Sequence, residues 1–217
     1  MGGMRFLKPH EIARIEAVLA ADPSEYAPRN RALFAVGLGT GGRIAELLGL
    51  KVGNAYDAGG RPLPVVYFEK ATTKGKRRGR SVPVLPFLRE VLEVYYPWRL
   101  AKAGGSLEAD DPLFISNKGG AVRPDSASRI FRELFQAAGV GGRVATHSLR
   151  KTRAQSLLRA GAPLPIISNV LGHRDVRTTM AYLSVDPEAV ERAIAVADRH
   201  YTRAGAETPV VQLPVAG

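Results

Sequence analysis

The chain has 217 residues, of which 45% are hydrophobic, and it carries 31 Lys and Arg residues against 20 Asp and Glu residues. That length suffices for one sizeable domain or two small ones, and the hydrophobic content excludes wholesale disorder. The net charge of +11 favours a polyanionic partner such as nucleic acid. There is no cysteine, which excludes disulfides and Cys-ligated zinc, and no apolar run approaches the roughly 20 residues of a membrane span. We therefore expect a cytoplasmic protein with no membrane partner.

The first fifty residues predict three helices. Pro9 stands where a helix tolerates proline in its first turn, and apolar residues then recur on one face until residues 22–23, Asp-Pro. A second helix is expected over residues 28–38 and a short third one over 43–50. Between these two helices, the sequence Gly-Thr-Gly-Gly at 39–42 predicts a flexible break.

The middle of the chain changes to a strand pattern. Residues 65–68, Val-Val-Tyr-Phe, and residues 81–84, Ser-Val-Pro-Val, both favour extended structure. The strongly basic run at 74–80 lies between them and predicts a hairpin tip. Such a run also occurs where charge merely keeps a strand end solvated.

The remainder of the chain is predicted to be mainly helical. A loop is expected at 104–112 and a short extended piece at 113–115, and the Ala, Gly, Pro and Val of 205–217 predict a flexible tail. The helices are expected over residues 86–102, 124–138, 147–160, 163–171, 176–183 and 187–201. The fold class is therefore mainly α with a small antiparallel sheet (α+β), in one domain over residues 1–204.

Three segments carry side chains suited to phosphate chemistry, although each alone has an ordinary structural interpretation. Arg43 begins a helix beside flexible glycines, where a guanidinium can grip a phosphate with two hydrogen bonds. Lys74, or Lys76 on spacing alone, lies in the basic hairpin, from which a lysine can reach into a groove and deliver a proton. His147 and Arg150 are three residues apart, so they share a face of their helix.

A fourth segment is Leu171-Gly172-His173, followed nine residues later by Tyr182. Gly172 can end one helix, which leaves His173 in the turn and Tyr182 near the end of the next helix. Together with the arginine, the lysine and the His-x-x-Arg segment, this pattern resembles the tyrosine recombinase (phage integrase) family. The resemblance covers the family's catalytic domain from about residue 7 to 185, and its last two motifs are the specific ones.

The resemblance implies a role for each residue of these motifs. The implied catalytic residues are Arg43, Lys74, His147, Arg150, His173 and Tyr182, with Glu46 as an acidic residue that supports them. Tyr182 is the implied nucleophile and forms a 3′-phosphotyrosine, His147 accepts its proton, and Lys74 protonates the leaving 5′ oxygen. The two arginines and His173 stabilise charge on the phosphate.

Two further points about the hairpin follow from the resemblance. The segment from Lys74 to Val82-Pro83 is about one residue longer than the family's usual hairpin, so Lys76 stays open as the general acid. Additional DNA contacts are expected from Lys76, Arg77, Arg78 and Arg80, whose charge adds salt-dependent affinity.

The resemblance also implies the partners and the biological reaction. These are double-stranded DNA and a tetrameric synapse that recombines two duplexes through a Holliday junction, with a monomer left open for the protein without DNA. The reactions in question are integration, excision, inversion or dimer resolution. No metal or other cofactor is expected, because the sequence has no Walker motif, HExxH motif or acidic cluster for two-metal chemistry. The N-terminal core-binding domain that family members usually carry is expected to be absent from this sequence, either because the chain is truncated or because it is a short recombinase that acts without that domain.

Three other functions are consistent with parts of the sequence. Gly37, Gly39 and Gly42 form a GxGxxG pattern with Asp57 twenty residues after the first glycine, as in dinucleotide-binding enzymes, but no βαβ alternation follows. A DNA-binding module without catalysis would have the basic faces but would not need Tyr182. A type IB topoisomerase would use similar chemistry for DNA relaxation alone.

Overall fold

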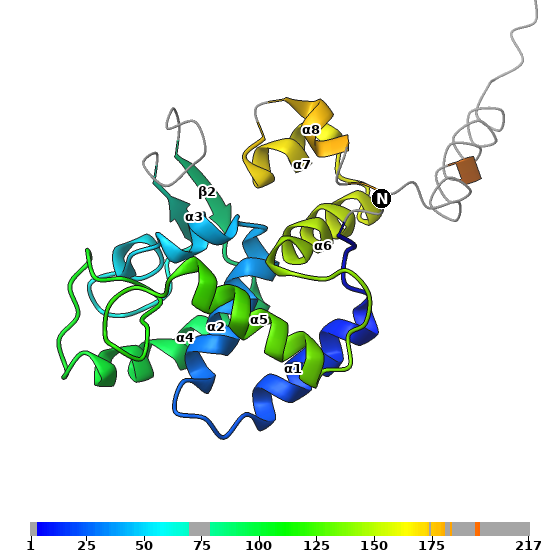
Figure 1. Cartoon of the computed structure of the whole chain (residues 1–217). Coiled ribbons are helices and arrows are strands. Elements are labelled where there is room, and N and C mark those ends of the chain that lie inside the picture. The colour runs from blue at the N-terminus through cyan, green and yellow to red at the C-terminus, as the bar shows by residue number, and fades with distance from the viewer. Residues whose placement is uncertain (1–3, 70–78, 174, 181–182, 184–193, 196–217) are drawn as a thin grey trace, which may run out of the picture. The chain divides into compact units, whose positions relative to one another are not determined.

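The computed structural model describes residues 4–69, 79–173, 175–180, 183 and 194–195 (Figure 1). Residues 1–183 form one compact unit, and residues 184–217 cluster separately. In the second unit, the two described residues are helical. The elements of the first unit are α1 (Pro9–Ala21), α2 (Ala27–Thr40), α3 (Ile44–Leu48), a 3₁₀ turn (Val52–Asn54), β1 (Val65–Phe68), β2 (Arg80–Pro83), α4 (Pro86–Lys102), α5 (Pro124–Ala137), α6 (Thr146–Arg159), α7 (Leu164–Leu171) and α8 (Val176–Met180). The predicted α+β class, mainly helical with a small antiparallel sheet, is confirmed.

Several helices begin as their sequences predict. Proline stands in the first turn of α1, α2, α4, α5 and α7, where its missing N–H costs no helical hydrogen bond. At α1 the carboxylate of Glu11 accepts a hydrogen bond from the backbone N–H of Lys8 at 2.8 Å and pairs with Arg5 at 2.6 Å. These contacts fix where the chain enters its first helix.

The sheet consists of β1 and β2, which pair in antiparallel register with Val66 opposite Val82 and Phe68 opposite Arg80. Val66, Phe68 and Val82 are fully buried, whereas Tyr67 points outward, so one face of the sheet packs on the core. The antiparallel strand pair is therefore confirmed, with the second strand beginning and ending one residue earlier than predicted. The tip of the hairpin, residues 70–78, lies outside the described residues.

Two hydrophobic cores of unequal size hold the first unit together. The main core joins α1 to α5, the sheet and the start of α6, which contributes Leu149. The small core consists of Ala154 from α6 and Ile167 and Leu171 from α7, bordered by partly buried leucines. We call residues 164–180, which form α7 and α8, the α7–α8 module. In Figure 1 it lies at the top, beside β2 and α6, with which α7 makes its contacts.

The break predicted at residues 39–42 begins later than expected. Helix α2 continues through Thr40, whose hydroxyl donates to the carbonyl of Val36 at 2.6 Å, and the chain turns at Gly41 with φ of 63°. Close packing explains the glycines before the break, because a Cβ on Gly37 would lie 2.7 Å from Leu149 Cδ1. The first two glycines of the GxGxxG pattern thus lie inside a helix that packs on α6, and they do not follow a strand as a dinucleotide-binding loop would.

Candidate active site

Arg150 lies at the point where several elements of the first unit meet. It is fully buried in α6 and donates from Nη1 to the carbonyl of Gly41 at 2.7 Å and from Nη2 to that of Leu171 at 2.5 Å. One guanidinium therefore holds the end of α2 and the end of α7 together. Charge-assisted hydrogen bonds of this kind are strong, and the carbonyls at a helix end need such donors.

Glu46 is the anionic centre of the arrangement. Its carboxylate accepts hydrogen bonds from the backbone N–H of Arg43 at 2.9 Å, from Arg43 Nη1 at 2.7 Å and from Arg80 Nη2 at 2.9 Å. Burial would raise the pKa of Glu46, but the hydrogen bonds from Arg43 and Arg80 and the charge of Arg80 bring it below its usual value. The ionised carboxylate therefore fixes the backbone and the side chain of Arg43 at the start of α3.

His147 is half-buried in the first turn of α6. Burial lowers its pKa first, and the positive charges of Arg150, Lys151 and Arg43 lower it further. The imidazole is therefore mostly neutral near pH 7 and can accept a proton.

His173 occupies the turn after α7. Gly172 adopts a left-handed conformation with φ of 66° at the helix end, and the N–H of His173 donates back to the carbonyl of Ser168 at 2.9 Å. Its Nδ1 lies 2.8 Å from Oγ1 of Thr179 in α8, which fixes the ring. Burial, followed by the charges of Arg150 and Arg43, lowers the pKa of His173 to about 4.

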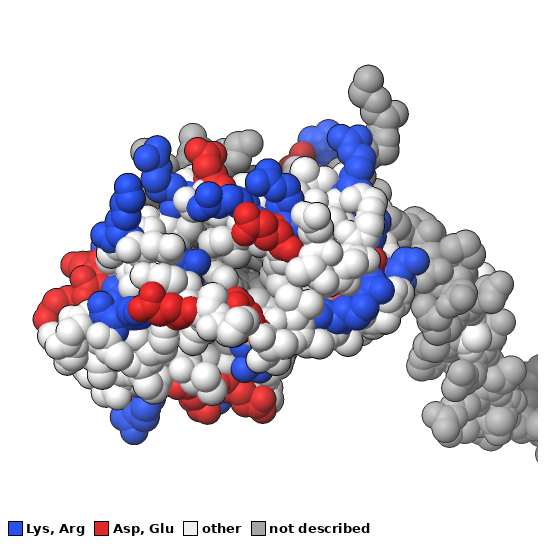
Figure 2. All heavy atoms as spheres, turned by 60° about the horizontal axis from the view of Figure 1, so that its bottom comes forward, with Lys and Arg blue, Asp and Glu red and all other residues white. Residues whose placement is uncertain are grey.

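Two arginines and two histidines thus share one electrostatic neighbourhood. Arg43 and Arg150 lower the pKa of both imidazoles, although the residues come from α3, α6 and the end of α7. Such a site combines fixed positive charge with neutral nitrogen groups that can donate or accept protons, which suits a phosphate ester. Lys and Arg side chains also follow much of the upper edge of the molecule in Figure 2.

Comparison with known proteins identifies the family. The model of the phage integrase family matches residues 5–189. The chain belongs to this family. It is 34% identical over 210 residues to tyrosine recombinase XerC of Rhodospirillum centenum, covering 92% of this chain and 57% of that protein. The crystal structure of XerA recombinase superposes with a TM-score of 0.71 at 26% identity, over 90% of this chain and 64% of that one.

A further solved structure shares the fold of this family member. XerH site-specific recombinase, bound to a palindromic difH substrate, aligns with a TM-score of 0.73 at 23% identity over 91% of this chain and 55% of that one. The chain therefore spans between 55% and 64% of the length of these three proteins. The tyrosine recombinase resemblance predicted from the sequence is confirmed.

The structure brings together the predicted site residues that it describes. Arg43, Glu46, His147, Arg150 and His173 are joined by the contacts and electrostatic interactions given above. Five other predicted residues, Lys74, Lys76, Arg77, Arg78 and Tyr182, lie outside the described residues, and their roles stay predictions.

Arg80, predicted to be one of the DNA contacts of the hairpin, lies among the residues of this site. Its side chain is only 8% exposed and turns inward to Glu46 and the end of α7. The reason is a buried carboxylate that attracts it, which the basic run in the sequence does not reveal. Two other contacts of this site had no signal in the sequence. They are the hydrogen bond between the Thr179 hydroxyl and His173 and the hydrogen bond from Arg150 to the carbonyl of Gly41.

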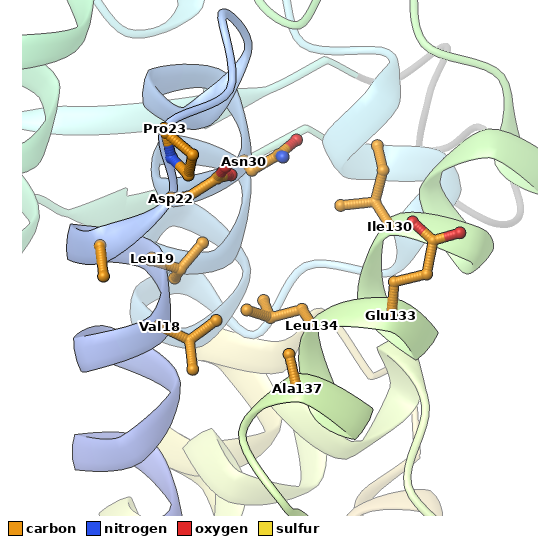
Figure 3. A pocket seen from close by; sticks show the side chains of 10 residues that line it. Val18, Leu19, Asp22, Pro23, Asn30, Ile130, Glu133, Leu134 and Ala137 are labelled. Atoms are coloured by element: carbon orange, nitrogen blue, oxygen red, sulfur yellow. The ribbon is translucent and has the colours of Figure 1, made fainter.

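A pocket away from the arginine and histidine cluster has a different lining. It has a volume of about 440 Å³ and lies between α1, α2 and α5, with Val18, Leu19 and Leu134 on its walls (Figure 3). It adjoins Asn30 near the beginning of α2, whereas the arginine and histidine cluster adjoins the other end of that helix. Its polar lining residues are Asp22, Asn30 and Glu133, and none of its lining residues is a Lys, Arg or His that could bind a phosphate.

Within the described part of the chain, no three His, Asp or Glu side chains gather in a way that could hold a metal ion. No helix in that part has the length and apolar character needed to cross a membrane.

Proposed function

We propose that this chain is the catalytic part of a site-specific tyrosine recombinase, which cleaves and rejoins double-stranded DNA through a 3′-phosphotyrosine at Tyr182. The observation that carries this proposal is that Arg150 binds the carbonyls of Gly41 and Leu171, which lie two residues before Arg43 and His173. His147 lies in the same helix as Arg150, one turn earlier. Family membership supports it, as do the name of the XerC relative and the DNA bound to the XerH relative.

Charge stabilisation on the phosphate comes first in the proposed mechanism. Attack on a phosphodiester concentrates negative charge on the non-bridging oxygens, and fixed cations stabilise that charge most in the transition state. Arg43 keeps 26% of its side chain exposed and is held by Glu46, so it contacts the phosphate directly. Arg150 is fully buried and stabilises the same phosphate through the electrostatic effect of its positive charge. His173 donates a further hydrogen bond to this phosphate.

Proton transfers complete the reaction. A free tyrosine has a pKa near ~10 and is a poor nucleophile at neutral pH, so Tyr182 needs a proton acceptor. His147 takes this proton, since its lowered pKa keeps the imidazole in the neutral form that can accept one. Lys74, or Lys76, protonates the 5′ oxygen as the P–O bond breaks and the Tyr182 O–P bond forms.

The covalent intermediate explains how strands can be exchanged without an energy source. The phosphotyrosine retains the phosphoester bond, so a 5′ hydroxyl from a second duplex can attack it and release Tyr182. We propose that residues 1–204 provide this chemistry and that four copies act on two duplexes. A DNA-binding module without catalysis and a topoisomerase that only relaxes DNA are the competing functions. The recombinase-named relatives favour strand exchange over both.

The decisive experiment uses nicked duplexes with randomised arms as suicide substrates. After cleavage, the short strand between the nick and the cleaved bond diffuses away, so the covalent adduct accumulates and is seen on a denaturing gel. We expect an adduct with the wild-type chain and with Tyr26→Phe, which removes a hydroxyl at the far end of α2, but none with Tyr182→Phe. Absence of any adduct from the folded wild-type chain would overturn the proposal, and relaxation of a plasmid without strand exchange would favour the topoisomerase.

A further inference from the structure

Arg80 makes three directed contacts from the start of β2. Its Nη2 donates to Oε2 of Glu46 at 2.9 Å, and its Nη1 donates to the carbonyl of Val170 in α7 at 3.0 Å. The guanidinium carbon lies 4.0 Å from the centroid of the Phe68 ring, which holds the planar group from one side. The side chain is therefore fixed in place and is shared between two parts of the molecule.

The first contact leads to Arg43. Glu46 binds the Nη2 of Arg80 through Oε2 and the Nη1 of Arg43 through Oε1, and Oε2 also accepts the backbone N–H of Arg43. A carboxylate shared in this way has little freedom to rotate, because both of its oxygens are engaged. Arg80 thereby limits the positions that the guanidinium of Arg43 can adopt.

The second contact leads to His173. Val170 lies in the last turn of α7, and cations stabilise the exposed carbonyls at a helix C-terminus. Three residues later comes His173, whose backbone N–H is bonded to Ser168 in the same helix. Holding the end of α7 therefore also sets the position of the His173 turn.

Close packing shows that the contact with α7 is tight. A Cβ on Gly172 would lie 2.8 Å from Cδ and 2.9 Å from Nε of Arg80, which is closer than side chains pack. The left-handed glycine thus serves two purposes, since it ends α7 and leaves room for the stem of the arginine. A lysine could neutralise Glu46 but could not supply two coplanar donors to Glu46 and Val170 together.

We propose that Arg80 is a positioning residue that couples Arg43 to the His173 turn, so that both groups reach the same phosphate. Its effect on cleavage rests on the proposed function, whereas its effect on the placement of α7 does not. The competing roles for Arg80 are a direct DNA contact, as the basic hairpin suggested, and general structural support.

The experiment compares wild type, Arg80→Lys and the control Arg61→Lys, a change at an exposed arginine that pairs with Asp57. DNA affinity is measured by fluorescence anisotropy, and single-turnover cleavage is measured with the nicked duplex at saturating DNA. For Arg80→Lys we expect affinity within about twofold of wild type and cleavage slowed by roughly 30- to 100-fold, as small misplacements of reacting groups produce. Arg61→Lys should match wild type in both. Weakened binding with normal cleavage at saturation would instead assign Arg80 to DNA contact.

Substituting the scissile phosphate by an uncharged methylphosphonate separates positioning of Arg43 from general support. The penalty of Arg80→Lys should then fall below about tenfold, because Arg43 has less charge to neutralise. An undiminished penalty would overturn the coupling to Arg43.

Hydrogen–deuterium exchange without DNA tests the contact with α7. Peptides covering residues 167–173 should exchange faster in Arg80→Lys, while peptides of α2 should not change. Unchanged exchange at 167–173 would overturn the coupling to the His173 turn. This measurement decides the question even if the wild-type chain forms no adduct, an outcome that would refute the proposed function alone.

Discussion

The main core and the α7–α8 module are held in different ways. The main core is built from many elements, including α2, which contributes fully buried Leu33 and Phe34. Among its described side chains, the module has few fully buried apolar ones, such as Ile167, and the end of α7 is held by the guanidinium groups of Arg80 and Arg150. The main core thus supplies stability through apolar burial, whereas polar contacts set the placement of His173. Substitutions in the two regions should therefore have different consequences.

Leu33 and Ile167 are both fully buried, but they lie in different cores. The largest difference between the two regions is therefore expected when each is replaced by alanine. Leu33→Ala should lower the free energy of unfolding by about 2–5 kcal/mol, because it leaves a cavity in the main core. Ile167→Ala should lower it less and should mainly speed hydrogen exchange within residues 164–180. Urea unfolding and hydrogen–deuterium exchange measure the two effects. Equal losses of global stability would show that the two cores unfold as one.

A smaller effect is expected from Gly172→Ala. The residue combines a φ of 66° with close contact to Arg80, so the variant should lose about 1–3 kcal/mol of stability and cleave DNA more slowly. Gly139→Ala is the matched control, because its φ is 61° and a Cβ there would meet nothing within 4 Å. Thermal unfolding of both variants separates the cost of the backbone conformation from that of the contact. Equal losses of stability in the two variants would mean that the Arg80 side chain moves aside at little energetic cost.

The smallest effect concerns the pH dependence of stability. Because the pKa of His173 falls to about 4 in the folded chain, the unfolded chain binds more protons than the folded one between pH 4 and the ordinary value of 6.5. Stability contributed by neutral His173 is therefore complete above pH 6.5 and is lost as the pH falls toward 4. Allowing for solvent screening of a half-exposed ring, the loss is about 1 kcal/mol.

His173→Gln provides the control for this titration. Its unfolding free energy, subtracted from that of the wild type at each pH, removes the contributions of the other titratable groups. The difference should shrink as the pH falls from 6.5 to 4. A constant difference over this range would contradict a lowered pKa for His173.

The sequence predicted well those features that depend on local pattern. Helix α4 runs over Pro86–Lys102 as expected, because a proline at its start and an apolar stripe determine it within one segment. The Leu-Gly-His pattern likewise predicted that α7 ends before His173, since a glycine at that position readily adopts positive φ. The pairing of the two strands followed from their composition and from the short basic connection.

Features that depend on distant partners were not predictable in this way. The flexible break expected at 39–42 was wrong for its first two residues, because α2 packs on α6 and continues to Thr40. Arg80 belongs to a basic run, yet a carboxylate 34 residues earlier draws it inward. Likewise, nothing local connects His173 with Thr179, because a turn and a short helix first have to bring them together.

Arg150 has a practical consequence for anyone who wants an inactive form of this chain. Its guanidinium joins the backbone at Gly41 to the backbone at Leu171, so the cation is also a cross-link between two segments far apart in sequence. Removing it would leave two carbonyl groups without their donor and would loosen the scaffold along with the chemistry. Under the proposed function, an inert but intact form for trapping DNA complexes is therefore better made at Tyr182 than at this arginine.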